Sequence, residues 1–255
     1  MKLRIGGLVD ISTVDYRGHV TFMIFFAGCN FRCPFCQNAP LIPVGSGREV
    51  DLDYVRRRVE ESAPLLDAVG ASGGEPALQP GALTELFRWA KGRGLRTFLN
   101  TNASCPAVVG RLVEEGLVDH VAMDVKGPLS DPERLGAIIG LPEKEASRMA
   151  ENIRRTLRIC LENGVPLEVR TTVVPSLVDD EETIRAICRA VSETGGCDAY
   201  CLQQFVPMDS VLDPRLREVD SPSRDLLASL ARAALEEGME NVYVRTREHG
   251  VERIG

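Results

Sequence analysis

The 255-residue chain has little of several features that mark common classes of protein. It holds three histidines and one tryptophan, and its longest apolar run, residues 20–28, is far too short to span a bilayer. Acidic residues outnumber basic ones by 37 to 30, and the formal charge of −7 argues against a nucleic-acid or anionic-membrane surface. The first residues lack the apolar core of a signal peptide, so a cytoplasmic protein is expected.

Several catalytic motifs are also absent from the sequence. There is no Gly-rich phosphate loop, no H-E-x-x-H and no G-x-S-x-G, which excludes the common hydrolases and nucleoside triphosphatases. The histidines, at positions 19, 120 and 249, form no ligand spacing with one another or with an acid. The chemistry of the protein must therefore depend on other residue types.

Cysteine, in contrast, is plentiful, with eight in the chain. Cys29, Cys33 and Cys36 form the pattern C-x-x-x-C-x-x-C, with Phe35 directly before the last cysteine. A structural zinc site is closed by four protein ligands. A cubane of four irons and four sulfurs has four corners, so three cysteines leave one iron open for a substrate or cofactor. The pattern therefore predicts a 4Fe–4S cluster, with a zinc knuckle or an oxidised-thiol loop as the alternatives.

The other five cysteines are interpreted differently. Disulfides are not expected in a reducing compartment. Cys160 and Cys188 lie on apolar helical stripes and are predicted to be small core residues. The sequence does not decide the role of Cys105, Cys197 and Cys201. Cys197 and Cys201 could bind an auxiliary cluster, or all three could be ordinary buried or surface residues.

Strand and helix signals alternate along the chain. Short β-branched or aromatic runs occupy residues 20–26, 66–72, 95–100, 119–125, 167–174, 199–206 and 241–245. Asp51 and Asp179 are predicted N-caps, while Gly94, Gly116 and Gly164 are predicted to end helices. Such alternation favours parallel strands joined by right-handed crossovers.

We therefore predict an α/β fold, a partial (β/α)6 TIM-type barrel of parallel strands, although pattern alone leaves an open sheet possible. The prediction is a single domain over residues 1–255. Residues 1–19 are expected to form a small N-terminal hairpin extension with residues 15–18 as its turn, residues 20–215 the barrel core, and residues 216–255 a C-terminal helix and a possible extra strand.

Polar motifs recur where the predicted strands end, which is where parallel α/β folds gather reactive groups. They are the cysteine triplet, Gly73-Gly74-Glu75, Asn100-Thr101-Asn102, Asp124 with Lys126, Arg170 and Gln203. The glycine pair allows positive φ and close approach of the backbone, so its carbonyls could accept bonds from an ammonium group; an ordinary tight turn is the alternative.

The cysteine spacing and the Gly-Gly-Glu motif resemble those of the radical S-adenosylmethionine (SAM) superfamily. Over residues 3–215 the chain further resembles the glycyl-radical-enzyme activating family, above all the activating proteins of anaerobic ribonucleoside-triphosphate reductase. The stretches that carry this resemblance are 5–8, 15–18, 37–38, 72–76, 78–80, 100–102, 122–128, 170–175, 202–205 and 212–214. Related pyruvate formate-lyase activators have an acid where Asn100 stands and a histidine near Phe205. The first difference weakens the expectation of a cation beside SAM, and the second leaves the residues that contact adenine and ribose undetermined.

The resemblance implies that Cys29, Cys33 and Cys36 are the metal ligands and the catalytic residues. It implies SAM contacts from Phe35, Asn38, Gly73, Gly74, Glu75, Asn100, Thr101, Asn102, Asp124, Lys126, Arg170 and Gln203. For five of these residues the sequence itself leaves an alternative role. The asparagine motif could cap a strand, Lys126 could pair with Asp124 rather than meet the SAM carboxylate, and Arg170 could pair with Glu168.

The resemblance also implies a reaction and partners. Reductive cleavage of SAM would give a 5′-deoxyadenosyl radical, which would take a hydrogen atom from a glycine of a partner protein. The partners would be a glycyl radical protein, which the long connections 127–147 and 206–220 could hold, and an electron donor such as flavodoxin or ferredoxin. Radical chemistry on a small molecule or another peptide, and a non-catalytic iron–sulfur electron carrier, are the alternatives.

Overall fold

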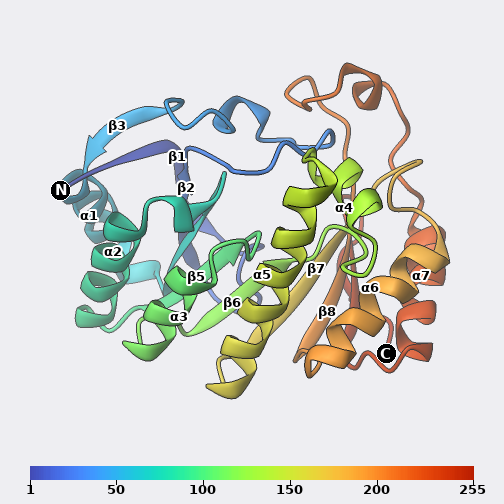
Figure 1. Cartoon of the computed structure of the whole chain (residues 1–255). Helices are drawn as coiled ribbons and strands as arrows, with labels where there is room; N and C mark the ends of the chain where they lie inside the picture. Colours follow the sequence, from blue (N-terminus) through green and yellow to red (C-terminus); the bar gives the residue numbers. More distant parts are fainter.

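The computed structural model describes residues 1–255 and contains one ten-stranded sheet in the order β10-β9-β8-β7-β6-β5-β4-β2-β1-β3 (Figure 1). Its central strands are parallel: β2 (Thr21–Phe26), β4 (Ala68–Gly73), β5 (Arg96–Thr101), β6 (His120–Asp124), β7 (Leu167–Val173), β8 (Ala199–Gln204) and β9 (Val242–Thr246). Antiparallel strands complete the edges: β1 (Lys2–Ser12), β3 (Arg48–Asp51) and β10 (Gly250–Arg253). No ladder joins β3 to β10, so the barrel is incomplete.

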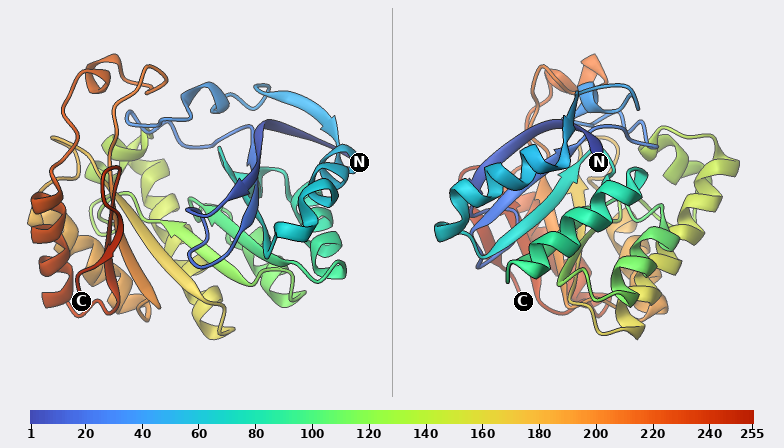
Figure 2. Two further views of the ribbon diagram at one scale, coloured as in Figure 1. Left: turned by 180° about the vertical axis from the view of Figure 1, so that it is seen from behind. Right: turned by 90° about the vertical axis from the view of Figure 1, so that its left-hand side faces the viewer.

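Helices follow the parallel strands and cover one face of the curved sheet (Figures 1 and 2). They are α1 (Leu52–Ser62), α2 (Pro80–Gly92), α3 (Pro106–Glu114), α4 (Pro132–Ile139), α5 (Glu143–Glu162), α6 (Glu181–Thr194) and α7 (Arg224–Glu236). Short 3-10 turns are η1 (Ala39–Leu41), η2 (Ala63–Leu65), η3 (Pro76–Leu78) and η4 (Pro214–Arg217). The predicted partial α/β barrel is confirmed. None of the helices combines the length and the apolar composition of a membrane-spanning segment.

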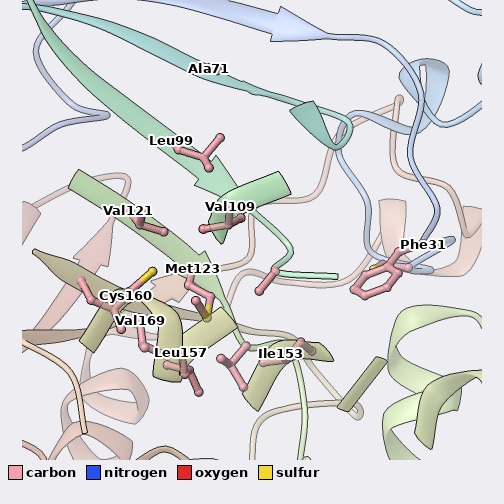
Figure 3. Packing of buried hydrophobic residues seen from close by; sticks show 14 of the residues in the cluster. Phe31, Ala71, Leu99, Val109, Val121, Met123, Ile153, Leu157, Cys160 and Val169 are labelled. Atoms are coloured by element: carbon pink, nitrogen blue, oxygen red, sulfur yellow. The ribbon is translucent and has the colours of Figure 1, made fainter. Parts of the chain in front are cut away.

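The main core lies between the sheet and its helices. Figure 3 shows strand residues Leu99, Val121, Met123 and Val169 beside Val109 of α3 and Ile153, Leu157 and Cys160 of α5. Cys160 and Cys188 are both fully buried, at 0% exposure, which confirms their predicted place in the core.

The predicted parallel strands agree with the observed ones to within two residues at each end. The N-terminal hairpin differs from the prediction. Residues 2–12 form one strand that contains a bulge between Ile5 and Gly7 and pairs with β2, so the turn residues 15–18 join β1 to the barrel itself. Strands β3 and β10 were not predicted.

Helix ends agree only in part with the predicted caps. Asp51 is the residue directly before α1, as predicted, but its side chain makes no capping hydrogen bond. Gly94, Gly116 and Gly164 adopt positive φ values of 76°, 64° and 64°, as their predicted positions after helices require. The predicted cap at Asp179 is wrong by one residue. The side chain of Asp180 accepts from the Thr183 N–H at 2.8 Å and begins α6, while that of Asp179 accepts from the Ser176 N–H.

The β1–β2 connection, residues 13–20, reaches across the open side of the barrel to β9, and we call it the strap. Arg245 of β9 donates to the Val14 carbonyl at 2.7 Å, and the Arg17 guanidinium lies 3.9 Å from the centre of the Tyr243 ring. Within the barrel Tyr16 stacks on Phe98, with ring centroids 5.2 Å apart. The incomplete barrel is therefore bridged along part of its open side.

Candidate functional site

A cavity of about 190 Å³ lies where the parallel strands end. Every predicted site residue except Glu75 and Arg170 lines it. The lining that the sequence did not predict consists of Phe31, Gln37, Ile42, Ser72, Thr172 and Phe205. In Figure 1 the cysteine-bearing segment after β2 and the long loop after β8 lie at this same end of the sheet.

The three cysteines belong to residues 28–38, the cysteine loop, which contains no helix or strand. Backbone bonds from distant segments hold it instead. The Cys29 N–H donates to the Ile42 carbonyl at 2.9 Å, and the Glu75 N–H donates to the Gly28 carbonyl at 2.8 Å. The loop therefore takes its shape from its neighbours rather than from local secondary structure.

The two long connections that were expected to hold a partner contact the cysteine loop. At the end of α4 the Ile139 carbonyl accepts from the Arg32 N–H at 2.8 Å. In the loop after β8 the Asp213 N–H donates to the Pro34 carbonyl at 2.8 Å. Gly140, which ends α4 at a φ of 69°, lies so close that a Cβ there would collide with the Arg32 carbonyl.

Burial governs the chemistry of the three thiols. It raises the pKa of Cys29 to about 11 and that of Cys33 to about 12, and it also raises the pKa of Cys36. Iron binding must displace these protons, because the thiolate is the ligand. No group of three or more His, Cys, Asp or Glu side chains is placed to hold a single metal ion. The three cysteines nevertheless line the same cavity. Their arrangement therefore fits a cluster of several irons better than a single metal ion.

The Gly73-Gly74 turn brings the end of β4 against the cysteine loop. Gly73 adopts a φ of 115°, and a Cβ on Gly74 would collide with the Gly28 carbonyl. These glycines are therefore required by packing, in addition to lining the cavity. The Gly73 carbonyl accepts from the Asn38 side chain at 3.3 Å.

Glu75 points away from the cavity, contrary to its predicted place among the SAM contacts. Its buried carboxylate accepts from the Asn102 N–H at 2.7 Å, the Thr101 hydroxyl at 2.8 Å and the Ala77 N–H at 3.0 Å. Burial raises its pKa to about 7, although these donors oppose the shift. Glu75 therefore fixes the end of β5, which carries the asparagine motif.

Lys126 and Asp124 form the charged part of the wall. The Lys126 Nζ atom lies 2.9 Å from Oδ2 of Asp124 and 5.9 Å from the centre of the Phe35 ring. Burial works against the charged lysine, but the Asp124 carboxylate outweighs it and the pKa of Lys126 is raised. Lys126 thus forms the predicted ion pair and also faces the cavity, where a protonated amine could bind a carboxylate.

Asn100 presents an unpaired acceptor at the cavity wall. Its Nδ2 donates to the Ser72 hydroxyl at 2.9 Å, while its buried Oδ1 has no hydrogen-bond partner. A buried acceptor without a donor costs about 1–3 kcal/mol. An ammonium or hydroxyl group of a bound ligand would remove that cost, so the residue fits a ligand such as SAM.

Arg170 adopts the structural alternative among its two predicted roles. Its Nε lies 2.6 Å from Oε1 of Glu168, and its Nη2 donates to the Asp15 carbonyl of the strap at 2.9 Å. Burial opposes ionisation of Glu168, but the charge of Arg170 lowers the pKa of that carboxyl. Thr172, two residues further along the same face of β7, reaches the cavity in its place.

The family model of the Radical SAM superfamily matches residues 23–187 of the chain. A Methanocaldococcus jannaschii protein that carries the name of a glycyl-radical enzyme activating enzyme is 32% identical over 252 residues, 96% of this chain and 97% of that one. The pyruvate formate-lyase-activating enzyme of Clostridium pasteurianum is 27% identical over 241 residues, 87% of this chain and 92% of its own.

A radical SAM methyltransferase from Sphaerobacter thermophilus has the same fold, with a TM-score of 0.68 at 17% identity over 90% of this chain and 67% of that one. The sequence matches, the fold and the cysteine-lined cavity agree with one another. The chain belongs to the radical SAM superfamily and, within it, to the family of glycyl-radical-enzyme activating enzymes.

Proposed function

We propose that this radical SAM enzyme activates anaerobic ribonucleoside-triphosphate reductase by installing a glycyl radical on it. The main observation behind this proposal is that one cavity is lined both by the three cysteines of the cysteine loop and by Asn100, Asp124 and Lys126 from two strand ends. The sequence stretches shared with activators of that reductase support this choice of partner. The names of the relatives support a glycyl radical partner in general.

In this proposal Cys29, Cys33 and Cys36 hold a 4Fe–4S cluster, and the remaining wall binds SAM. When bound, these two groups supply reductive carbon–sulfur cleavage followed by hydrogen abstraction. Lys126 binds the SAM carboxylate while Asp124 keeps it charged and oriented. The orphaned Oδ1 of Asn100 accepts from a SAM ammonium or hydroxyl group.

The other cavity residues shape the site and exclude water. Phe31, Phe35 and Phe205 contribute apolar surface, which a reactive alkyl radical needs around it. Asn38, Gly73, Gly74, Thr101, Asn102 and Gln203 supply further polar contacts to SAM. Glu75 holds the backbone of Asn102 and Arg170 holds the strap, and neither is proposed as a SAM contact.

We place the enzyme in the cytoplasm, with a small electron carrier such as flavodoxin or ferredoxin as donor. All eight cysteines are free thiols, which agrees with a reducing compartment. The acidic net charge of −7 supports a protein partner rather than nucleic acid or a membrane surface.

Electron paramagnetic resonance on anaerobically reconstituted, dithionite-reduced protein tests the cofactor sites. We expect a reduced 4Fe–4S signal that changes when SAM is added. Cys33→Ala should lose the intact cluster and all SAM cleavage, while Cys197→Ala, which alters a cysteine outside the cavity, should keep both. A cluster signal indifferent to SAM would instead support a non-catalytic iron–sulfur electron carrier.

The partner is tested by adding purified anaerobic reductase or, in parallel, pyruvate formate-lyase to the reduced enzyme and SAM. A glycyl radical doublet is expected with the reductase and not with the lyase. Radical formation on the lyase alone would reject the proposed partner while keeping the activase function. SAM cleavage with no radical on either protein would favour a small molecule or another peptide as substrate.

A further inference from the structure

A closed ring of hydrogen bonds joins the cysteine loop to the end of β5. Asn102 donates from Nδ2 to Oδ1 of Asn30 at 2.9 Å, and Asn30 donates from Nδ2 to the Ser104 hydroxyl at 2.9 Å. The Ser104 backbone N–H closes the ring by donating to Oδ1 of Asn102 at 3.0 Å. From α5, Asn152 donates to the Ser104 carbonyl at 2.8 Å. Two loops and a helix are thereby held in one arrangement.

This ring determines which way the Asn102 amide points. The two ends of an asparagine amide have nearly the same shape, so their assignment depends on their hydrogen-bond partners. The Ser104 backbone N–H can only donate, so Oδ1 of Asn102 must face it and Nδ2 must face Asn30. The Asn102 backbone N–H is bound to Glu75 at 2.7 Å, and the residue is only 5% exposed, so the amide has little freedom to turn.

One N–H of the Asn102 amide is thereby directed at a cysteine sulfur. The amide group has two N–H donors, and Asn30 takes one of them. The Sγ atom of Cys29 lies 3.9 Å from the same Nδ2. The backbone N–H of Phe31 also donates to this sulfur, at 3.4 Å. Cys29 therefore receives one donor from its own loop and one from Asn102, directly after β5.

We propose that Asn102 raises the reduction potential of the iron–sulfur cluster through its hydrogen bond to Cys29. The inference rests on the proposed role of Cys29 as a cluster ligand. Hydrogen bonds to the sulfurs are among the factors that set the potential of such clusters. The reduced cluster carries one more negative charge than the oxidised one, so an N–H donor stabilises the reduced form more. Asn102 thus makes reduction easier, independently of any contact with SAM.

The test is a potentiometric titration of the reconstituted holoenzyme, followed by electron paramagnetic resonance in the absence of SAM. Asn102→Ala removes the donor to Cys29. Ser104→Ala is the matched control, because it deletes the hydroxyl of the same ring but leaves the Ser104 N–H that orients Asn102. For Asn102→Ala we expect the ratio of reduced to oxidised cluster at a fixed potential to fall about tenfold, a negative shift of about 59 mV. Ser104→Ala should titrate like the parent protein.

Two results would overturn the proposal. One is an unchanged midpoint reduction potential in an Asn102→Ala protein that has a complete cluster. The other is an equal shift of the midpoint potential in both variants, which would mean that loosening of the cysteine loop is the cause. If Asn102→Ala assembles no cluster, the neutral Asn102→Leu, which has a similar volume, is judged by the same criterion. It loses both N–H donors and adds no charge beside the cluster.

A measurement on the unaltered protein gives an independent decision. With ¹⁵N-labelled asparagine, pulsed electron paramagnetic resonance of the reduced enzyme should detect an asparagine amide nitrogen coupled to the cluster. No such coupling in a protein with an intact cluster would reject the proposal. A parent protein that binds no 4Fe–4S cluster would instead reject the proposed function, so the two failures are distinguishable.

Discussion

Lys126 carries the positive charge of the cavity wall, and methionine can replace it with little change of shape. Lys126→Met keeps the length of the side chain but leaves the half-buried Asp124 without its partner. We expect the dissociation constant for SAM to rise about tenfold or more, which corresponds to about 1.4 kcal/mol. Iron content should not change. Calorimetric titration of the reconstituted protein with SAM, together with an iron assay, measures both.

Lys144→Met is the control for this change, because Lys144 is an exposed residue of α5 away from the cavity. Its affinity for SAM should equal that of the parent protein. If Lys126→Met also binds SAM normally, Lys126 serves only the ion pair with Asp124.

His120 makes stability depend on pH. Its ring stacks on Tyr16 and Phe98, at centroid distances of 4.9 and 5.7 Å. Burial lowers its pKa to about 4; Arg170 and Arg17 act in the same direction, while Glu168 and Asp198 oppose them. Between pH 6.5 and about 4 the unfolded chain therefore binds a proton that the folded chain does not, so stability falls as the pH falls.

His120→Gln should flatten this part of the pH profile. Urea denaturation of the apoprotein at several pH values between 6.5 and 4 measures it. His249→Gln, a change at an exposed residue, should keep the profile of the parent chain. Parallel profiles for His120→Gln and the parent would contradict the assigned cause.

Residue types and their spacing predicted the polar wall of the cavity but not the direction of every side chain. Glu75 belongs to the predicted motif, yet its carboxylate turns to the backbone of Asn102, a partner 27 positions away that no local pattern reveals. Strand alternation could have identified Thr172, because it lies two residues from Arg170 on the same face. The apolar lining residue Phe31 carries no comparable signal, since an isolated phenylalanine more often belongs to a core.

Gly140 shows how the end of a helix shapes the cysteine loop. An alanine there would adopt a strained left-handed conformation, which costs about 1–2 kcal/mol, and its Cβ would also displace the Arg32 carbonyl. We expect Gly140→Ala to lower both the free energy of unfolding and the amount of iron retained per chain. Urea denaturation and iron analysis after reconstitution measure the two effects.

Gly116→Ala separates backbone strain from the effect on the loop. Gly116 has a similar φ of 64°, but a Cβ there would meet nothing within 4 Å. This variant should lose a similar free energy of unfolding and retain its iron. Full iron retention in Gly140→Ala would show that α4 does not position the cysteine loop.

The predictability of each element followed its length and burial. The parallel strands were found because their buried runs of β-branched and aromatic residues stand out between amphipathic segments. Strands β3 and β10 were missed because each has four residues, mostly exposed, and therefore too little hydrophobic alternation to notice. Their pairing is decided by neighbouring edge strands rather than by their own composition.

For the whole molecule, the pair Glu168–Arg170 links the barrel interior to the strap. Glu168→Gln would leave Arg170 buried without an opposite charge, and we expect the free energy of unfolding to fall by about 3 kcal/mol. Hydrogen exchange in residues 13–20 should also become faster, because Arg170 donates to the Asp15 carbonyl there. Urea denaturation and exchange followed by mass spectrometry measure these effects.

Glu49→Gln is the matched control, because Glu49 forms an exposed pair with Lys2 at 2.7 Å. Exposed pairs of this kind contribute little to stability because water screens both charges, so little change in the free energy of unfolding and none in strap exchange is expected. If hydrogen exchange of the strap is unaltered in Glu168→Gln, the contacts of the strap with Tyr243 and Arg245 are sufficient to hold it in place.

The bridging of the barrel was beyond sequence reasoning. Residues 15–18 were correctly placed in a turn, but nothing local indicates that Arg17 would lie over Tyr243 or that Arg245 would reach Val14. Isolated arginines are most often surface residues. Contacts between the two ends of a chain emerge only once the intervening strands have set the curvature of the sheet.

The dependence of the cysteine loop on distant backbone partners has a consequence for biosynthesis. During translation the three cysteines leave the ribosome long before Asp213, whose amide completes the set of bonds to the loop. Iron delivery to a nascent chain would meet thiols without the frame that spaces them, so insertion is expected to follow release of the finished polypeptide. A transcript cut short before the codon for residue 206 would then yield a protein that has every cysteine ligand and still retains no iron.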